Sequence, residues 1–391
     1  MTSVYLEAAK AVRLDIEARG ADAEAMCRVP EELVAVLGKK GLFAMTIAEK
    51  YGGLELDVPD GLEVIEQLSY ADSAVGWLAM IYATTAHLGS FLPEEWAAKI
   101  YGVTQQADGF NCPRTAGAAA PSGQGSVVEG GVVVSGRWAW GSGSHHCDWI
   151  CGGTLVEEEG EIRRHASGEP AVHVMFFAKD QVELMDNWNP SGLRGTGSVD
   201  FVVNEQFVPE GRWTVLGQSR RQVDAPLFRF PFFGYFATAV ACVPLGIARR
   251  ALDDFDAIAR GKVPVAKTST INESSLVQLE FGQAEALVEG AHAYLYGKVR
   301  EVWARVVRGD KPTLEDRRQL RLAASGATRM CKAAVDKLYD AGGGTSLQGH
   351  CALQRHFRDI HAATQHRMVS PEMLRLSAAA RLSEQASLAQ L

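Results

Sequence analysis

The first hundred residues place apolar side chains at the three-and-four spacing of amphipathic helices. Asp60 and Glu63 stand at the start of the most regular series with the spacing of a capping box. The apolar members of that series are Leu62, Ile65, Leu68, Trp77, Leu78 and Ile81. Pro93 begins PEEWAAKIYG and predicts a further helix, because proline is favoured at a first helical position.

The pattern changes near residue 108 to short apolar runs separated by glycine. VVEGGVVVSGRWAW holds two such runs around Gly130 and Gly131, which is typical of a hairpin. HVMFFAKDQVEL and SVDFVVNEQFV are further predicted strands. We therefore predict a compact β unit that ends near residue 225.

Helical spacing returns from residue 226 onward. The stretch that begins at Pro312 and ends at Gly342–Gly344 carries one apolar face, formed by Leu320, Ala324, Ala327, Cys331, Ala334 and Leu338. Helices, strands and helices that follow one another in blocks indicate an α+β protein rather than an alternating α/β one. We predict three parts: an N-terminal helical domain at residues 1–107, a middle β domain at 108–225 and a C-terminal helical domain at 226–391.

One uncharged stretch, FPFFGYFATAVACVPLGIA at residues 230–248, is almost as long as a membrane span. Pro231, Pro244, Gly234 and Gly246 interrupt it, and no second stretch of this kind accompanies it. We therefore predict a helix buried inside a soluble bundle and no membrane span.

Composition narrows the class of partner. The chain has 39 basic and 47 acidic residues, and no dense basic run with interleaved aromatics, so we expect no nucleic acid. The seven cysteines are scattered and contain no C-x-x-C pair, which favours reduced thiols. The first residues lack the apolar core of a signal peptide, and a cytoplasmic protein is expected.

The histidines raise the question of a metal. In SHHCDW, residues 144–149, consecutive strand side chains would alternate between faces and would not converge on one ion. RDIHAATQH, residues 358–366, has a helical appearance, and on a regular helix His361 and His366 would lie about 140° apart. We predict no metal site, which leaves acid–base and structural roles for these side chains.

Three stretches resemble the acyl-CoA dehydrogenase superfamily, and more closely its oxygen-using branch, the group D two-component flavin-dependent monooxygenases. SGRWAWGSGSHHCDW is similar to the segment in which an aromatic residue, a spacer and a serine or threonine lie against flavin. WNPSGLRGTGSVDFVVNEQFVPEGR, residues 188–212, resembles the superfamily's G-L-R-G-T-x-S-x-D segment. LYDAGGGTSLQGHCALQRHFRDIHAATQH, residues 338–366, resembles its Gly-rich turn and active-site helix.

The same resemblance distinguishes the dehydrogenases of the superfamily from its oxygen-using branch. Dehydrogenases commonly carry a catalytic Glu eight residues beyond the Asp of R-D, and here that position is Arg367. Residues 231–248, a second place for such a base, hold no carboxylate. RDIHAATQH instead fits the oxygenase pattern R-D-x-H-A-x-x-x-H, which implies a catalytic His366, while GWLAMIYATTAHLGSF places His87 like this branch's N-terminal active-site histidine.

The resemblance implies an acyl-CoA dehydrogenase-like fold with N-terminal helices, a middle β-barrel, a C-terminal four-helix bundle and homotetramer assembly. It also implies the oxygenase component of a two-component enzyme. A separate NAD(P)H-dependent flavin reductase would supply reduced FMN or FAD, and O2 would give a C4a-hydroperoxyflavin that hydroxylates a phenolic or polycyclic aromatic substrate. No metal takes part.

Residue roles follow from the same match. Ser142 would hold the flavin N5 position, His366 would be the base for a phenol and His87 would orient the phenol or the peroxide. The residues expected to bind flavin are Trp140, Ser142, Arg194, Gly195, Thr196, Gly342 and Gly343. Trp140, Phe232, Phe233 and Tyr235 either line an apolar pocket or belong to the core.

Three alternatives stay open at this point. The first is an acyl-CoA dehydrogenase-like flavoenzyme that uses a base at another position. The same branch contains N- and S-oxidising monooxygenases. A non-catalytic member would keep the fold as a binding protein.

Overall fold

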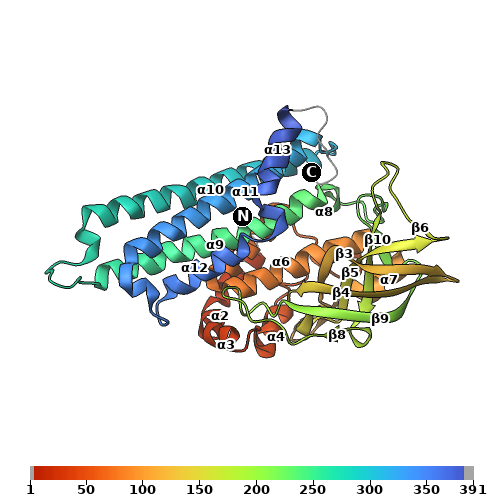
Figure 1. The fold of residues 1–391 in the computed structure, drawn as a ribbon, viewed down its shortest axis with the longest axis horizontal. Helices are drawn as coiled ribbons and strands as arrows, with labels where there is room; N and C mark the ends of the chain where they lie inside the picture. The colour runs from red at the N-terminus through yellow and green to blue at the C-terminus, as the bar shows by residue number, and fades with distance from the viewer. Residues whose placement is uncertain (1–3, 383–391) are drawn as a thin grey trace.

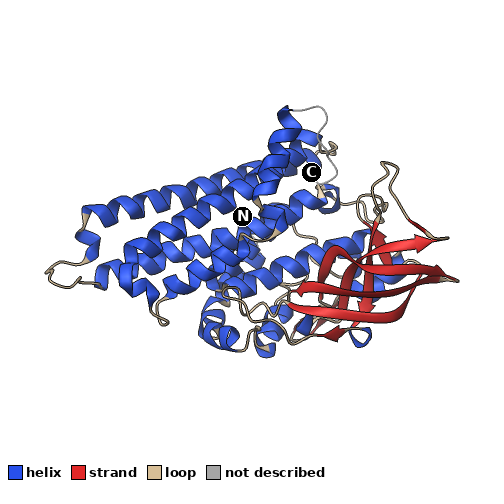
Figure 2. Ribbon diagram, in the orientation of Figure 1, coloured by secondary structure: helices blue, strands red, loops and turns tan. Residues whose placement is uncertain are grey.

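A computed structural model of the chain describes residues 4–382 and has helices at both ends of the sequence and strands in the middle (Figure 2). The N-terminal helices are α1 (Val4–Ala11), α2 (Arg13–Ala18), α3 (Gly20–Ala25), α4 (Glu31–Lys39), α5 (Val58–Ala71), α6 (Ser73–His87) and α7 (Glu94–Tyr101). The C-terminal helices are α8 (Pro226–Arg229), α9 (Phe232–Gly261), α10 (Ser275–Val307), α11 (Leu314–Gly342), α12 (Ala352–Ala363) and α13 (Pro371–Leu382).

The regular apolar series near residue 70 forms two helices, because the chain turns at Asp72. The side chain of Asp72 accepts hydrogen bonds from the backbone N–H groups of Ala74 and Val75 and so caps α6. The predicted capping box at Asp60 and Glu63 is wrong: α5 begins at Val58, and Asp60 lies in its first turn. The apolar series continues across the break, because α5 buries an apolar face and α6 is buried on all sides.

The strands form one main sheet at one end of the molecule (Figure 1). Its order is β10-β7-β5-β3-β4-β9-β8, with β6 paired to β5, while β1 and β2 form a separate ladder. The pairing is an open path in which the two end strands are joined to no further strand of the described chain. The bounds are β1 (Thr104–Gln106), β2 (Gly109–Asn111), β3 (Thr115–Val128), β4 (Gly131–Gly141), β5 (Trp149–Glu158), β6 (Glu161–Ile162), β7 (Val172–Ala178), β8 (Glu183–Leu184), β9 (Val199–Pro209) and β10 (Trp213–Val215).

The predicted hairpin is the antiparallel pair β3 and β4. Val128 lies opposite Gly131, so that Glu129 and Gly130 form the two-residue turn, and the φ of 76° at Gly130 explains the glycine. Further along, the register of β4 against β9 shifts between Trp138 and Gly141. This irregularity positions the residues of the candidate site.

The uncharged stretch forms the first part of α9, and Pro231 is its N-cap residue. By length and composition α9 is able to cross a membrane, yet 78% of its most apolar window is buried inside the protein. The helix is therefore the central core helix of the bundle, as predicted. Pro244 lies inside it without ending it.

The predicted apolar face of α11 is also confirmed, since all six of its residues are fully buried. Helices α9, α10 and α11 lie side by side, and α6 lies between this bundle and the sheet (Figure 1). Because α6 contacts both α9 and β3, its side chains connect the helical and β parts of the molecule.

Candidate active site

Ser142 lies just beyond the end of β4, in the turn after the register shift. Its side chain is 4% exposed and accepts a 3.1 Å hydrogen bond from the indole N–H of Trp77, on α6. Gly143 follows with a φ of 74°, and a Cβ there would lie 2.6 Å from the hydroxyl oxygen of Tyr82. Glycine is therefore required at 143, and the turn that presents Ser142 is fixed by close packing.

Ser142 begins a chain of buried hydroxyl groups. Its oxygen is 2.7 Å from that of Ser198, which is 2.6 Å from that of Thr196, which is 2.8 Å from the carbonyl oxygen of Leu193. The indole at one end only donates and the carbonyl at the other only accepts, so all four bonds form only if each hydroxyl donates toward Leu193. Ser142 has then used its proton, and a ligand at this oxygen must be a donor.

Trp140 stands at the surface beside Ser142. Its φ is 63°, a left-handed conformation that is rare for a bulky residue, and its side chain is 71% exposed. Trp138, two residues earlier, is fully buried and stacks on Phe201. The register shift thus turns one indole outward next to a buried hydroxyl, which is a surface suited to a planar ligand.

His366 lies outside the helix that the sequence indicated. α12 ends at Ala363, and His366 caps a short 3-10 turn, Arg367–Val369. The spacing of about 140° on a shared helix therefore does not apply to His361 and His366. The His366 ring makes edge contacts with Trp77 at 5.5 Å and with Phe236 at 5.4 Å between centroids.

The backbone decides the tautomer of His366. The N–H of Met368 donates to Nδ1 at 3.2 Å, so the neutral ring carries its proton on Nε2 and presents a donor there. Burial, together with the charge of Arg321, lowers the pKa of His366 to about 4. The predicted role as a base fits poorly with this arrangement, because Nδ1 is engaged and Nε2 is already protonated.

His87, at the end of α6, is fully buried among aromatic rings. It stacks on Tyr235 at 5.5 Å and contacts Phe228 and Phe232 at 5.2 and 5.4 Å. Both of its ring nitrogens and the Tyr235 hydroxyl are buried without a hydrogen-bond partner in the described chain. Burial, and then the charge of Arg221, lowers the pKa of His87 to about 3, so the ring is neutral.

The two histidines do not meet. His87 lies ten residues from Trp77 on α6, about 15 Å along the helix axis. Aromatic contacts link His366 to His87 through Phe236 and Phe232, whose centroids are 6.3 Å apart. The predicted pair therefore occupies two ends of one aromatic wall.

His361 and His146, two other histidines of these motifs, have local partners. His361 donates from Nδ1 to the Phe357 carbonyl oxygen at 2.7 Å, and its Nε2 is 3.4 Å from an Asp336 oxygen. His146 Nδ1 is 2.6 Å from a carboxylate oxygen of Glu31. These contacts are structural ones between neighbouring elements.

The side chain of Asp359 links the R-D segment to the G-L-R-G-T segment in the folded protein. Its buried carboxylate accepts hydrogen bonds from the Leu193 N–H at 2.7 Å and from the Ser73 hydroxyl at 2.5 Å. It thereby joins α12, the start of α6 and the turn that anchors the hydroxyl chain. Desolvation raises the pKa of Asp359, although nearby Arg355 opposes that shift.

The predicted flavin-binding residues of the G-L-R-G-T segment have other contacts. Arg194 donates to the oxygens of Glu24, Asn189 and Pro190 and to the sulfur of Cys27, so most of its N–H groups are occupied. A Cβ at Gly195 would lie 2.9 Å from that of Ala74. Of these predicted residues only Thr196 is connected to Ser142, through the hydroxyl of Ser198.

Gly342 and Gly343 lie at the opposite end of the bundle. The Lys262 ammonium group, just beyond the C-terminal end of α9, donates to the Gly342 carbonyl oxygen at 2.6 Å. Phe236, beside His366, is 26 residues earlier on α9, about 39 Å along a straight helix. One copy of the chain does not bring these glycines to Ser142.

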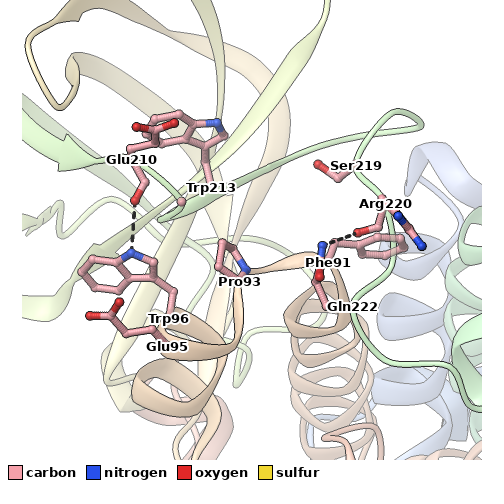
Figure 3. Close-up of a pocket in the computed structure, with 10 residues that line it drawn as sticks. Phe91, Pro93, Glu95, Trp96, Glu210, Trp213, Ser219, Arg220 and Gln222 are labelled. Carbon is pink, nitrogen blue, oxygen red and sulfur yellow. Dashed lines mark hydrogen bonds between the residues drawn. The ribbon is translucent and has the colours of Figure 1, made fainter.

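A surface groove of about 560 Å³ lies elsewhere, between α7 and the segment around β10 (Figure 3). Trp96, Trp213 and Arg220 line it, and the Trp96 indole donates to the Glu210 carbonyl oxygen. Neither Ser142 nor either candidate histidine lines this groove. Phe91 does, and its ring is 6.4 Å from His87, so the groove borders the far end of the aromatic wall.

Sequence reasoning missed the residue that joins the site together. Trp77 was expected as one more core position, and it is indeed 6% exposed. A buried indole nevertheless needs an acceptor for its N–H, which was an available signal. Ser198 and Phe236 were missed as well, since a small polar residue and an apolar helix position carry no distinctive pattern.

The comparisons with known proteins agree with this fold. Residues 5–95 match the N-terminal domain of acyl-CoA dehydrogenases, and residues 238–371 match their C-terminal domain. The fold and the site thus define a flavoenzyme of the acyl-CoA dehydrogenase superfamily. The 3-HSA hydroxylase from Rhodococcus sp. RHA1 has a similar crystal structure, with a TM-score of 0.87, 25% identity and coverage of 98% of this chain and 97% of that one.

Relatives identify the branch. The chain is 31% identical to the indole-3-acetate monooxygenase of Acinetobacter baumannii, over 86% of this chain and 83% of that protein. It is 27% identical to the oxygenase subunit HsaA of a flavin-dependent monooxygenase from Rhodococcus jostii, over 90% and 91%. It is 26% identical to the oxygenase component of the p-hydroxyphenylacetate 3-hydroxylase of A. baumannii, over 92% and 84%. The protein belongs to the oxygenase components of two-component flavin-dependent monooxygenases, a family of soluble enzymes.

Proposed function

We propose that this oxygenase component hydroxylates an aromatic substrate, phenolic or polycyclic, with reduced FMN or FAD and O2. The observation that carries the proposal is the position of Trp77, which donates to Ser142 and contacts the His366 ring from one indole. This arrangement places a fixed acceptor and a fixed donor at the meeting point of the sheet and the bundle. An oxygenase component implies a separate flavin reductase, which delivers the reduced flavin.

Reduced flavin supplies two electrons, so that one oxygen atom of O2 enters the substrate and the other leaves as water. Ser142 would hold the flavin edge, because its oxygen keeps a lone pair for a donor such as N5–H. Holding that proton in place protects against wasteful loss of H2O2. Trp140, exposed next to this hydroxyl, would cover the flavin ring.

We assign His366 the role of a hydrogen-bond donor rather than that of a base. Its Nε2–H would bind the oxygen of a phenol and stabilise the negative charge that develops there when the ring attacks oxygen. A neutral imidazole suits this role at neutral pH, since its pKa is about 4. Phe236 and Phe232 would line the pocket and keep water away.

His87 and the Tyr235 hydroxyl would lie at the remote end of this pocket. Two buried polar groups without hydrogen-bond partners destabilise the folded protein, unless a ligand supplies the missing hydrogen bonds. We propose that they bind a polar group of an elongated substrate. His87 would then position the substrate rather than contact the reacting oxygen.

We also propose a homotetramer, in which Gly342 and Gly343 bind the flavin of a neighbouring copy. Their distance from Ser142 within one copy supports this arrangement. Leu276 and Leu279 on α10, exposed at 65% and 55%, offer apolar surface for such contacts.

One experiment tests the core of the proposal. The purified protein is mixed with reduced FMN or FAD and then with oxygen, and the absorbance of the oxygenated flavin is followed. A species that persists for seconds before oxidised flavin appears is expected. Immediate oxidation with both flavins would contradict the proposal.

Substrate class is tested with a generic flavin reductase and a panel of aromatic compounds. Indole-3-acetate and 4-hydroxyphenylacetate belong in the panel because two relatives carry these names. Fused-ring quinols, amino sugars and thioethers complete it. Hydroxylation at carbon is expected, and oxidation only at nitrogen or sulfur would favour those alternatives.

A further inference from the structure

Arg321, in the middle of α11, is a buried cation without an anionic partner. Its side chain is 1% exposed, and no Asp or Glu between residues 4 and 382 forms an ion pair with it. Its guanidinium donates to the Phe233 carbonyl oxygen at 3.4 Å, to the Met368 sulfur at 3.1 Å and to the Met373 sulfur. Its Nε has no acceptor. Thioether sulfur is a weak acceptor, so this charge is poorly satisfied.

Arg318, one turn earlier on α11, is also a buried arginine, but it has a carboxylate as its partner. It is 4% exposed, and its guanidinium makes two 2.6 Å hydrogen bonds to the Glu315 carboxylate. Burial, and then the charge of Arg367, lowers the pKa of Arg321 to about 10, so the group stays charged at neutral pH. A buried charge without its counter-ion is strongly unfavourable, which indicates that a ligand supplies the counter-ion.

The residues around Arg321 adjoin the aromatic wall that contains His366 and Phe232. Phe233 adjoins Phe232 on α9, and Met368 donates its backbone N–H to His366. Met368 thereby links the two side chains, because its sulfur accepts from Arg321 and its backbone N–H donates to His366. Methionine side chains are flexible, and Met368 and Met373 are able to yield their places at the guanidinium to a better acceptor.

We propose that Arg321 binds the carboxylate of the substrate, and that the substrate is therefore an aromatic carboxylic acid. A carboxylate can accept hydrogen bonds from two N–H groups of a guanidinium at once. The two terminal nitrogens of Arg321, which now donate to the sulfurs of Met368 and Met373, offer this geometry. Arg321 is buried, and no carboxylate of residues 4–382 pairs with it, which favours a small ligand as the source of the counter-ion. The inference rests on the proposed function for the location of the pocket.

Binding measurements without turnover test it. Equilibrium dialysis of the full-length protein compares indole-3-acetate and 4-hydroxyphenylacetate with their uncharged primary amides. We expect the acid to bind roughly 10-fold to 100-fold more tightly than its amide. Arg321→Met should abolish that preference, because the acid loses far more affinity than the amide. Arg321→Lys, which keeps the charge but not the fork, should retain part of it.

Arg318→Met is the matched control, because it removes a buried arginine of the same helix that has its own carboxylate. It should keep the preference for the acid. Equal binding of acid and amide by the wild-type protein would overturn the proposal, as would an unchanged preference in folded Arg321→Met.

A separate arm distinguishes a flavin phosphate from a substrate carboxylate. If Arg321→Met weakens the binding of FMN but not that of riboflavin, Arg321 serves the flavin and the proposal is wrong. Failure of the proposed function would appear elsewhere, as absence of a persistent oxygenated flavin in the wild-type protein. The acid and amide affinities are read independently of that result.

Discussion

The indole N–H of Trp77 donates to the hydroxyl oxygen of Ser142 at 3.1 Å, across an interface between α6 and the end of β4. Trp77 also contacts the His366 ring, so one side chain sets the relative positions of the two candidate catalytic groups. Because each hydroxyl of the chain donates toward Leu193, the Ser142 oxygen can only accept from a ligand on the sheet side. The Nε2–H of His366 is the donor on the bundle side. The expected effects of changing Ser142 and His366 follow from this arrangement of one acceptor and one donor.

Replacing Ser142 with alanine should shorten the lifetime of the oxygenated flavin by roughly 5-fold to 10-fold, since one hydrogen bond is worth about 1–1.5 kcal/mol. Stopped-flow absorbance after oxygen mixing measures it. Ser135→Ala is a control on β4, the strand that precedes Ser142, because its hydroxyl is exposed and accepts from the Glu205 N–H. Equal lifetimes in Ser142→Ala and the wild-type protein would remove Ser142 from its proposed role.

The donor role of His366 predicts a flat pH profile. With a folded pKa of about 4, the ring is neutral above pH 5 and protonates at Nδ1 only as the pH falls through about 4. The fraction of reducing equivalents that ends in product should be constant from pH 5.5 to pH 8 and low in His366→Ala. An inflection near pH 6.5 that disappears in His366→Ala would show instead that His366 acts as a base with an ordinary pKa.

His87 should make stability depend on pH. The unfolded chain takes up a proton on this residue below about pH 6.5, whereas the folded protein does so only near pH 3. The free energy of unfolding should therefore fall with decreasing pH, by up to about 1.4 kcal/mol per pH unit from this residue. Urea unfolding at pH 7, 6 and 5 measures it.

His87→Phe should flatten that dependence and raise stability at pH 7 by about 1–3 kcal/mol, because it removes two unpaired nitrogens from an aromatic cluster. A variant at the exposed His350 serves as control. A steeper pH dependence in His87→Phe than in the wild-type protein would contradict the assignment of this histidine as neutral and buried.

Arg321 and Arg318 should respond in opposite directions when each is replaced with methionine. Without ligand, Arg321→Met should raise the free energy of unfolding by about 1–3 kcal/mol, because an uncompensated buried charge is lost. Arg318→Met should lower it, because Glu315 loses its partner. Urea unfolding of both variants gives the comparison, and destabilisation by Arg321→Met as large as that by Arg318→Met would show that its present contacts suffice.

Asp359→Ala should destabilise the protein by about 3 kcal/mol or more, because the Leu193 N–H and the Ser73 hydroxyl both lose a buried acceptor. The same change should shorten the lifetime of the oxygenated flavin, since Leu193 anchors the hydroxyl chain to Ser142. Asp340→Ala, on a less buried position of α11, is the comparison. Wild-type stability in Asp359→Ala would show that this contact is dispensable.

The sequence alone was sufficient for the elements whose causes are local. The hairpin at Gly130 follows from turn geometry, and the buried face of α11 follows from a period of 3.6 residues. The resemblance of short segments predicted Trp140, Ser142 and His366 as site residues, and it identified the family. Helix ends were harder, because the break at Asp72 and the end of α12 at Ala363 do not interrupt the apolar pattern.

Only the tertiary structure decided how the site is connected. The hydrogen bond between Trp77 and Ser142 spans 65 residues, and the backbone bond that selects the His366 tautomer depends on a turn that periodicity does not reveal. Arg321 has the pattern of an ordinary helix residue, and its missing counter-ion appears only when all of its neighbours are in place. Apolar spacing records which residues are buried, whereas the partner of a buried polar group is fixed by packing between distant segments.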